Sequence, residues 1–438
     1  MQKQMIDRRV PPAAAPLEKT PFPTVHTRTL RNGTTVYLVP YGTQPVVELG
    51  AVFPGGRSFE PAAAIATFTG KMLQEGTRNY TGLEFARRLD HLGAFIGVET
   101  GYENATVLLT SLVKHLGSTI PLLQEMLLQP IFPEKDLSKL KTRTIQHLDV
   151  ENQKTGFRAR KEFNRLVFGP DHPYGRSAER EDIRIVENDM LKAYWRKNFN
   201  FRNLRLVAVG RFDESQLLRM LEDHFGTPDV ADPAQKVNLD QSYARQVAPE
   251  HPTGLRYFEM PDTMQATVRI GHRGFSRHHS DYYRMQVVNT VLGGYFGSRL
   301  MKNIREDKGY TYGIGSAWLG MRYGGYFLAQ TDVGNQYIQP TLDEMEKEIH
   351  RLIDQGLEDT ELGLVKNYML GRMISGRETP MQIFELIKSI ISNGLPFQAL
   401  DDKFDIIQGM TTEEVQELAA KHLQPEKLLK VVCGKMDN

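Results

Sequence analysis

Apolar residues along this chain of 438 residues recur with two periods, one typical of strands and one typical of helices. Alternating apolar and polar positions predict strands at 27–39, folded as a hairpin around Asn32-Gly33, and at 46–52. The clearest helical segment runs from Asp281 to about Lys308. Its apolar residues form one stripe that we expect to be buried core: Met285, Val288, Val291, Leu292, Leu300, Met301 and Ile304.

A helix followed by a buried strand occurs twice in the chain. Residues 191–199 and 204–210 match residues 415–423 and 428–434, with a constant offset of 224 residues. Such an internal repeat indicates that one structural unit has been duplicated. We therefore expect an α+β protein made of two homologous units of about 200 residues each.

Polar residues stand where the two repeated helices are expected to begin. Asn188 or Asp189 can cap the first helix, because their side chains accept hydrogen bonds from free backbone N–H groups. In the second copy, Thr411 and Glu414 have the spacing of a capping box. Both patterns predict a defined helix start.

Composition shifts divide the chain into four segments. Residues 1–24 are rich in proline and alanine, have no apolar core of a signal peptide, and predict a weakly ordered arm. Residues 228–256 carry proline, aspartate and glutamine without periodicity and predict a surface linker. The two domains are then expected at 25–227 and 257–438. No segment approaches the roughly 20 apolar residues that a transmembrane helix needs.

Charge and cysteine content narrow the possible partners and locations. With 54 basic and 53 acidic residues, the net charge of +1 gives no electrostatic reason to expect nucleic acid or an anionic membrane as partner. A single cysteine, Cys433, excludes an intramolecular disulfide but is compatible with an extracytoplasmic protein. We expect a bacterial periplasmic location with the signal peptide already absent, and the cytoplasm is the alternative.

Residues 64–77 read AIATFTGKMLQEGT and have the frame of a metal-binding helix. This segment resembles the zinc-protease helix of the M16 (pitrilysin, or inverzincin) metallopeptidases, which reads roughly GxAHxxEHMxFxGT. The shared letters are Ala66, Phe68, Met72, Gly76 and Thr77. The resemblance implies the fold of that family, in which two α/β-sandwich domains form one half of a clamshell.

The catalytic letters of this motif are missing. In HxxEH, two histidines four residues apart bind zinc and the glutamate deprotonates the metal-bound water. The corresponding residues here are Thr67, Gly70 and Lys71. A hydroxyl is a poor zinc ligand, glycine has no carboxylate, and an ammonium group repels a dication. We therefore expect no metal in this chain.

The family's third zinc ligand is a glutamate on a later helix. Counting back from residues 172–176, HPYGR, which resemble the family's HPxGR, places that ligand position at His147. One imidazole remains where a catalytic zinc site needs three protein ligands. We interpret His147 as a surface or interhelical histidine.

A second signature lies in the C-terminal half. Residues 293–300, GGYFGSRL, and 304–312, IREDKGYTY, are similar to the M16 pattern GGxxSSRLFxxIREKxGLxY. In that family the arginine and the tyrosine seven residues later reach across the clamshell to the zinc of the other half. The resemblance assigns this role to Arg305 and Tyr312.

A catalytic role for Arg305 and Tyr312 is physically reasonable, but a purely structural role for both residues is the alternative. An arginine ending a helix, a glycine turn and a tyrosine on the following strand can converge and donate hydrogen bonds to a developing oxyanion. Alternatively, Arg305 pairs with Glu306 or Asp307, and Tyr312 packs within the sheet.

The first half also lacks the family's substrate-holding pair. Active members hold the peptide along an edge strand that begins with Asn-Ala, where the substrate adds as another strand. The aligned residues here are Gly97 and Val98, and Asn104-Ala105 falls out of register. We expect that this half has lost substrate clamping together with zinc.

The resemblance implies a specific function for the whole chain. It identifies the chain as the non-zinc R/Y subunit of a heterodimeric M16-type metalloendopeptidase, inactive alone and acting on unfolded peptides. The partner would be an HxxEH-bearing homologue that carries the zinc. The alternatives are a catalytically inactive structural or peptide-binding subunit and, less favoured, a free-standing zinc protease with unusual ligands.

Overall fold

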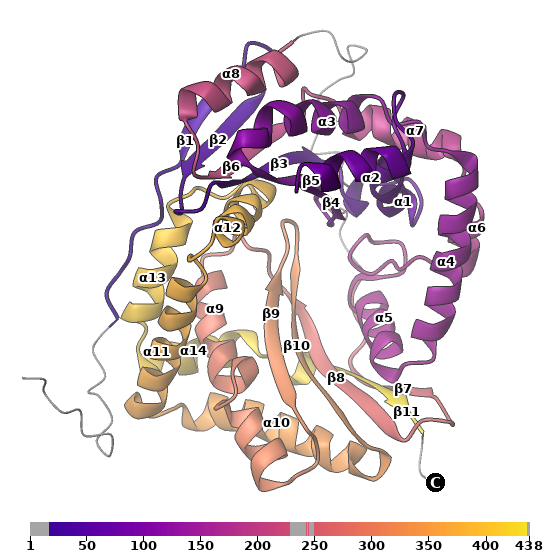
Figure 1. The fold of residues 1–438 in the computed structure, drawn as a ribbon. Coiled ribbons are helices and arrows are strands. Elements are labelled where there is room, and N and C mark those ends of the chain that lie inside the picture. The colour runs from indigo at the N-terminus through magenta and orange to yellow at the C-terminus, as the bar shows by residue number, and fades with distance from the viewer. Residues whose placement is uncertain (1–16, 228–241, 243, 245–248, 436–438) are drawn as a thin grey trace, which may run out of the picture.

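The computed structural model describes residues 17–227, 242, 244 and 249–435. Within them the strands form two sheets, one from each half of the chain (Figure 1). This arrangement confirms the predicted α+β architecture of two related units. Most of the expected arm at 1–24 and most of the expected linker at 228–256 lie outside the described residues, so those assignments stay predictions.

The first sheet has the strand order β1-β2-β6-β3-β5-β4, with β2 and β6 parallel and the other neighbours antiparallel. The predicted hairpin is present, and Gly33 adopts φ 87° in its turn, a conformation that glycine adopts without strain. The strands are β1 (His26–Thr29), β2 (Thr35–Pro40), β3 (Val46–Pro54), β4 (Phe95–Thr100), β5 (Asn104–Leu112) and β6 (Arg205–Gly210).

The second sheet repeats this plan with the order β7-β11-β8-β10-β9. Its one parallel pair, β7 and β11, corresponds to β2 and β6 of the first sheet. The last strand of each sheet, β4 or β9, therefore has one free edge. The strands are β7 (Gly254–Glu259), β8 (Gln265–Gly274), β9 (Ile314–Gly320), β10 (Gly325–Gly334) and β11 (Leu429–Gly434).

Amphipathic helices cover one face of each sheet with a large apolar core. The first core includes residues of α1 (Ile65–Met72), α2 (Gly82–His91), α3 (Leu116–Leu128), α4 (Glu134–Asn152), α6 (Arg180–Arg184), α7 (Asn188–Asn198) and α8 (Glu214–Phe225). The second includes α9 (Tyr282–Asn289), α10 (Ile338–Gln355), α11 (Asp359–Ser375), α13 (Ala399–Gly409) and α14 (Thr412–His422). Short 3₁₀ turns are η1 (Arg57–Phe59), η2 (Leu73–Glu75), η3 (Val113–His115), η8 (Asn335–Tyr337) and η9 (Pro425–Lys427). No helix of the described residues is long and apolar enough to cross a membrane.

The opposite face of each sheet is covered by a helix from the other half of the chain (Figure 1). Helix α5 (Thr155–Phe168) packs on β8 and β11, where Phe163 and Val167 join Val431 in one buried cluster. Helix α12 (Pro380–Asn393) packs on β3 and β6, where Phe384 joins Val207. The two halves are thus locked by a reciprocal exchange of helices, which the sequence did not predict.

The repeated helix and strand are confirmed, and their offset of 224 residues is kept by both α7 with α14 and β6 with β11. The capping box is also confirmed, because Glu414 N–H donates to Thr411 Oγ1 (3.2 Å) and Thr411 N–H donates to Glu414 Oε2 (3.0 Å). The predicted cap of the first copy is wrong. Helix α7 begins at Asn188, and the residue before it, Glu187, makes no side-chain capping bond.

The single helix predicted from Asp281 to Lys308 is interrupted. Helix α9 continues into the π-helical segment η6 (Thr290–Gly294), an irregular turn follows, and a second π-helical segment is η7 (Met301–Asp307). Two glycines and the turn after them break the hydrogen-bond ladder. The predicted apolar stripe is nevertheless buried.

Candidate functional site

Helix α1 keeps the frame of the zinc-protease helix because its start is held by buried charges. Glu60 accepts a hydrogen bond from the backbone N–H of Ala66 (2.8 Å), and Arg176 pairs with Glu60 (3.2 Å). Burial raises the pKa of Glu60, although the bond from Ala66 and the charge of Arg176 oppose the rise. Arg176 ends the HPYGR segment, so this motif helps to position α1.

The residues at the zinc positions of α1 do not fit a metal ion. Thr67 is partly buried, Gly70 is buried and Lys71 is exposed. A Cβ atom at Gly70 would lie 2.7 Å from Thr100 Oγ1 and 3.1 Å from Val98 Cγ1, so β4 occupies the space that a catalytic glutamate would need. Within the described residues, no group of three or more His, Cys, Asp and Glu side chains is arranged to hold a metal.

His147 lies on an exposed face of α4. Its charge helps to lower the pKa of Glu151 on the same helix, an effect that comes mainly from the hydrogen bond between Glu151 and Lys154. These surroundings are those of a solvated surface histidine. They agree with the interpretation of His147 as a surface histidine.

Gly97 and Val98, the residues aligned with the family's Asn-Ala pair, lie on the edge strand β4. Asn104 lies on the neighbouring strand β5, where it is paired with β3 and away from the sheet edge. Its side-chain amide donates to Ser392 Oγ of α12, so Asn104 connects the two halves of the chain. The chain's own Asn-Ala pair therefore has a structural contact across the halves.

Arg305 and Tyr312 lie together beside the free edge of the second sheet. Arg305 is in the last turn of η7, and its Nε donates to the backbone carbonyl oxygen of Tyr312 (2.9 Å). The guanidinium carbon lies 4.6 Å from the centroid of the Phe296 ring, a cation–π contact. Glu306 is a distant ion-pair partner, with 3.9 Å between its Oε1 and Arg305 Nη1.

Tyr312 is not packed in the sheet. Strand β9 begins at Ile314, so Tyr312 lies in the loop before it, and the expectation of a tyrosine on the strand is wrong. The side chain is 94% exposed, and in the described part of the chain its hydroxyl has no hydrogen-bond partner. The structural alternative in which Tyr312 packs within the sheet is therefore also wrong.

The glycines of the second signature allow the turn ahead of Arg305 to approach the sheet closely. A Cβ atom at Gly293 would lie 2.6 Å from Ser316 Oγ on β9. This approach brings the turn that contains Phe296 beside the start of β9. A larger residue at 293 would collide with Ser316 and Leu300.

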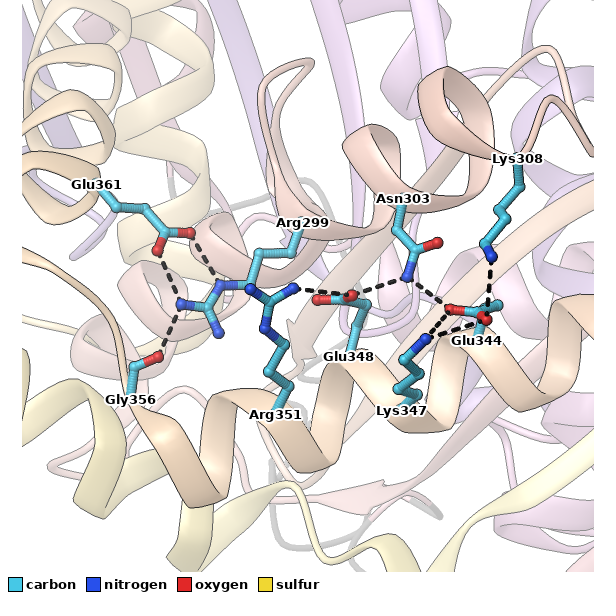
Figure 2. A network of polar contacts seen from close by, with 9 residues as sticks. All are labelled: Arg299, Asn303, Lys308, Glu344, Lys347, Glu348, Arg351, Gly356 and Glu361. Atoms are coloured by element: carbon cyan, nitrogen blue, oxygen red, sulfur yellow. Dashed lines mark hydrogen bonds and ion pairs between the residues drawn. The ribbon is translucent and has the colours of Figure 1, made fainter.

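Figure 2 shows that the other arginine of this signature, Arg299, is structural. Its guanidinium donates to both carboxylate oxygens of Glu361 (2.9 and 2.8 Å) and to the carbonyl oxygen of Gly356 (2.7 Å). Nearby, Asn303 donates to Glu344 and Glu348 (2.8 Å each). These bonds tie the helix of Arg305 to α10 and α11, so that Arg305 projects from a fixed support.

Two family profiles match the chain one after the other. The profile described as Insulinase (Peptidase family M16) matches residues 36–164, and the profile described as Peptidase M16 inactive domain matches residues 186–369. The chain belongs to the M16 peptidase family. The family resemblance seen in the sequence is confirmed.

Full-length M16 relatives carry different descriptions. An uncharacterized zinc protease of Streptomyces coelicolor is 24% identical over 383 residues, which cover 86% of this chain and 82% of that protein. A non-peptidase homolog, YmxG, of Helicobacter pylori is 24% identical over 403 residues, 87% of each chain. A crystal structure of a peptidase M16 inactive domain from Pseudomonas fluorescens has a TM-score of 0.85 at 24% identity and covers 94% of this chain and 98% of that one. The likeness to the solved structure shows the shared M16 fold.

Sequence reasoning missed two residues near the second signature. Phe296 could have been noticed as an aromatic residue within a glycine-rich turn. Arg269, which lines a pocket beside that turn, had as its only signal a charge within an apolar strand pattern.

Proposed function

We propose that this chain is the non-zinc subunit of a heterodimeric M16 metalloendopeptidase and that Arg305 and Tyr312 act at the zinc site of a partner subunit. The observation that carries the proposal is the Tyr312 hydroxyl, which is exposed and unpartnered in the described residues while the backbone of Tyr312 is held by Arg305. A tyrosine needed only for folding would be packed or hydrogen-bonded. In Tyr312 the backbone carbonyl is held by Arg305, whereas the hydroxyl is exposed to solvent.

The chemistry of the two side chains suits peptide hydrolysis. When water attacks a peptide carbonyl, negative charge develops on the carbonyl oxygen, and preorganised donors stabilise that charge. The Tyr312 hydroxyl and the terminal nitrogens of Arg305 are such donors, since only Nε of Arg305 is engaged with the Tyr312 carbonyl. An HxxEH-bearing homologue would supply the zinc ion and the general base.

A second candidate function is a structural or peptide-binding subunit that takes no part in the chemistry. The closed space at Gly70 and the non-peptidase relative favour it as much as they favour the first proposal. The exposure of Tyr312 favours the first proposal, because a scaffold has no use for an exposed tyrosine hydroxyl at that place. A free-standing zinc protease is disfavoured by Thr67, Gly70 and Lys71.

The test is reconstitution with an HxxEH-bearing M16 homologue that co-purifies with this chain. Alone, the chain should hold no stoichiometric zinc after dialysis and should not cleave a quenched unfolded peptide. The mixture should form a heterodimer by light scattering and show turnover that neither chain shows alone. A homologue that is fully active by itself and unaffected by a saturating amount of this chain would refute the proposal.

A further inference from the structure

A pocket of about 670 Å³ lies beside the loop of Tyr312, at the free edge of the second sheet. One wall is the start of β9 with the turn that contains Phe296. Another wall comes from the sheet face under α5, where Thr267, Arg269 and Gln330 line the pocket together with Gly156 of α5. The pocket is thus adjacent to the proposed catalytic pair but is built from other residues.

Arg269 is an unusual residue for such a wall, because it is a charged side chain that is only 7% exposed. None of the described residues forms an ion pair with it, and its one hydrogen bond is from Nη2 to the Gln330 side-chain oxygen. Its Nε is buried without a partner. The pKa of Arg269 is lowered to about 10, mainly by burial and also by the charge of Arg160, whereas the charges of Tyr326 and Asp332 oppose the shift. A buried, unpaired guanidinium destabilises a fold unless an anion binds it.

The N-terminus of α5 adds a second source of positive potential at the same wall. Gly156 lies in the first turn of this helix of 14 residues, and Thr155 Oγ1 accepts a hydrogen bond from Thr267 Oγ1 (2.9 Å). The first turn contains no acidic residue, and the N-cap residue Lys154 makes no side-chain capping bond. The free N–H groups and the helix dipole therefore favour an anion at this end.

We propose that this pocket binds a carboxylate group of the peptide confined by the M16 complex, with Arg269 and the first turn of α5 as donors. The inference deepens the proposed function, on which it rests for the identity of the ligand as a peptide. A monoanion fits better than a phosphate dianion, because the Asp332 carboxylate also lines the pocket and repels a second negative charge. The carboxylate is either an acidic side chain or the C-terminus of the peptide.

Three fluorescein-labelled decapeptides can separate the two sources. The first has one internal glutamate and an amidated C-terminus, the second replaces the glutamate by glutamine, and the third is the glutamine peptide with a free C-terminal carboxylate. Fluorescence anisotropy with the full chain should show one carboxylate peptide binding about tenfold to a hundredfold more tightly than the neutral peptide. Indistinguishable binding of all three, or binding of none, would overturn the inference.

Variants decide whether Arg269 is the donor. Arg269→Gln should abolish the preference for the carboxylate, whereas Arg256→Gln, on the exposed edge strand β7 of the same sheet, should keep it. Because the substitution removes an unpaired buried charge, Arg269→Gln should unfold at the same temperature as the wild type or a higher one. A lower unfolding temperature with the preference intact would assign Arg269 a structural role and refute the site.

A competition experiment tests the class of anion. Acetate should displace the bound carboxylate peptide at a lower concentration than inorganic phosphate does, and the reverse order would overturn the carboxylate assignment. None of these outcomes depends on turnover. A heterodimer whose activity needs Tyr312 but which shows no carboxylate preference would therefore refute this inference and leave the proposed function standing.

Discussion

Arg299 and Arg305 belong to one signature, but their surroundings differ. Arg299 is largely buried, and its Nε and Nη2 make a bidentate contact with Glu361 within the fold, while its Nη1 is buried. Arg305 uses Nε for the Tyr312 carbonyl and rests on the ring of Phe296. Among the described residues, its terminal nitrogens have only the distant carboxylate of Glu306 as an ion-pair partner. Of these two arginines, Arg305 is therefore the one whose N–H groups could donate hydrogen bonds to a partner subunit.

We expect Tyr312→Phe to keep the heterodimer and lower its kcat by about 10²–10³, because one oxyanion donor is lost with little change in shape. Arg305→Ala should have an effect of similar size. Steady-state kinetics of the reconstituted complex measure both. Tyr80→Phe is a matched control, since Tyr80 is also partly exposed and its ring contact with Arg88 survives the change.

His147→Ala completes the comparison and should leave turnover within about twofold, because no metal is expected at that residue. Near-normal turnover of the Tyr312 and Arg305 variants would make the structural-subunit alternative the better account.

The sequence could predict that Arg305 and Tyr312 belong together because an arginine and a tyrosine seven residues later form part of a recognisable motif. It could not predict Arg269, because only the sheet and α5 together reveal that its charge is unpaired.

At the scale of single elements, α1 shows how the zinc helix was remodelled. Glu60 and Arg176 still hold its start, while its former catalytic face now packs against β4 at Gly70. The frame letters are core residues, Ala66, Phe68 and Met72, all buried. Their burial in the core is reason enough for these residues, so the motif is readable without the metal ligands.

Gly70→Ala tests this packing against a matched glycine. Alanine favours a helix over glycine by up to about 1 kcal/mol, but at Gly70 its Cβ would lie 2.7 Å from Thr100 Oγ1, so we expect a net loss of about 1 kcal/mol. At Gly363, inside α11, nothing lies within 4 Å of the added Cβ, so Gly363→Ala should stabilise by about 0.5–1 kcal/mol. Urea unfolding of both variants measures the difference. Equal stabilisation of the two would show that β4 does not close this face.

Element boundaries were less predictable than element types. Periodicity predicted the apolar stripe after Asp281 correctly, because burial of that face dominates the pattern. It missed the break at η6 because an apolar stripe continues across a turn when the flanking helices share one core. The start of α7 was missed because Glu187, the residue before it, is exposed and makes no side-chain capping bond, so no sequence signal marks this boundary.

The whole molecule is organised by the exchange of α5 and α12. The duplicated units were readable from the offset of 224 residues. The exchange of α5 and α12 could not be predicted from the sequence, because a helix needs the same apolar face whether it packs on the sheet of its own half or on the sheet of the other half. The exchange means that each sheet is covered on both faces only when both halves are present.

This dependence predicts that the chain unfolds as one cooperative unit, although it contains two duplicated halves. Phe384 is fully buried, and its ring lies directly over Gly50 of β3, where a Cβ atom would be 2.2 Å from Phe384 Cε2. Phe384→Ala should therefore cost about 3–5 kcal/mol. Hydrogen exchange should rise in β3 and β6 of the other half as well as in α12, because they share the apolar cluster of Phe384.

Met381→Ala on the same helix is the control, because Met381 is exposed and its loss should change stability by less than about 0.5 kcal/mol. Calorimetry should show one transition for the wild type and one, shifted to lower temperature, for Phe384→Ala. Two transitions, of which the substitution moves only that of the C-terminal half, would show that the halves fold independently. In that case α5 and α12 would only form contacts between two independently folded domains. The position of Arg305 would then depend on the second half alone.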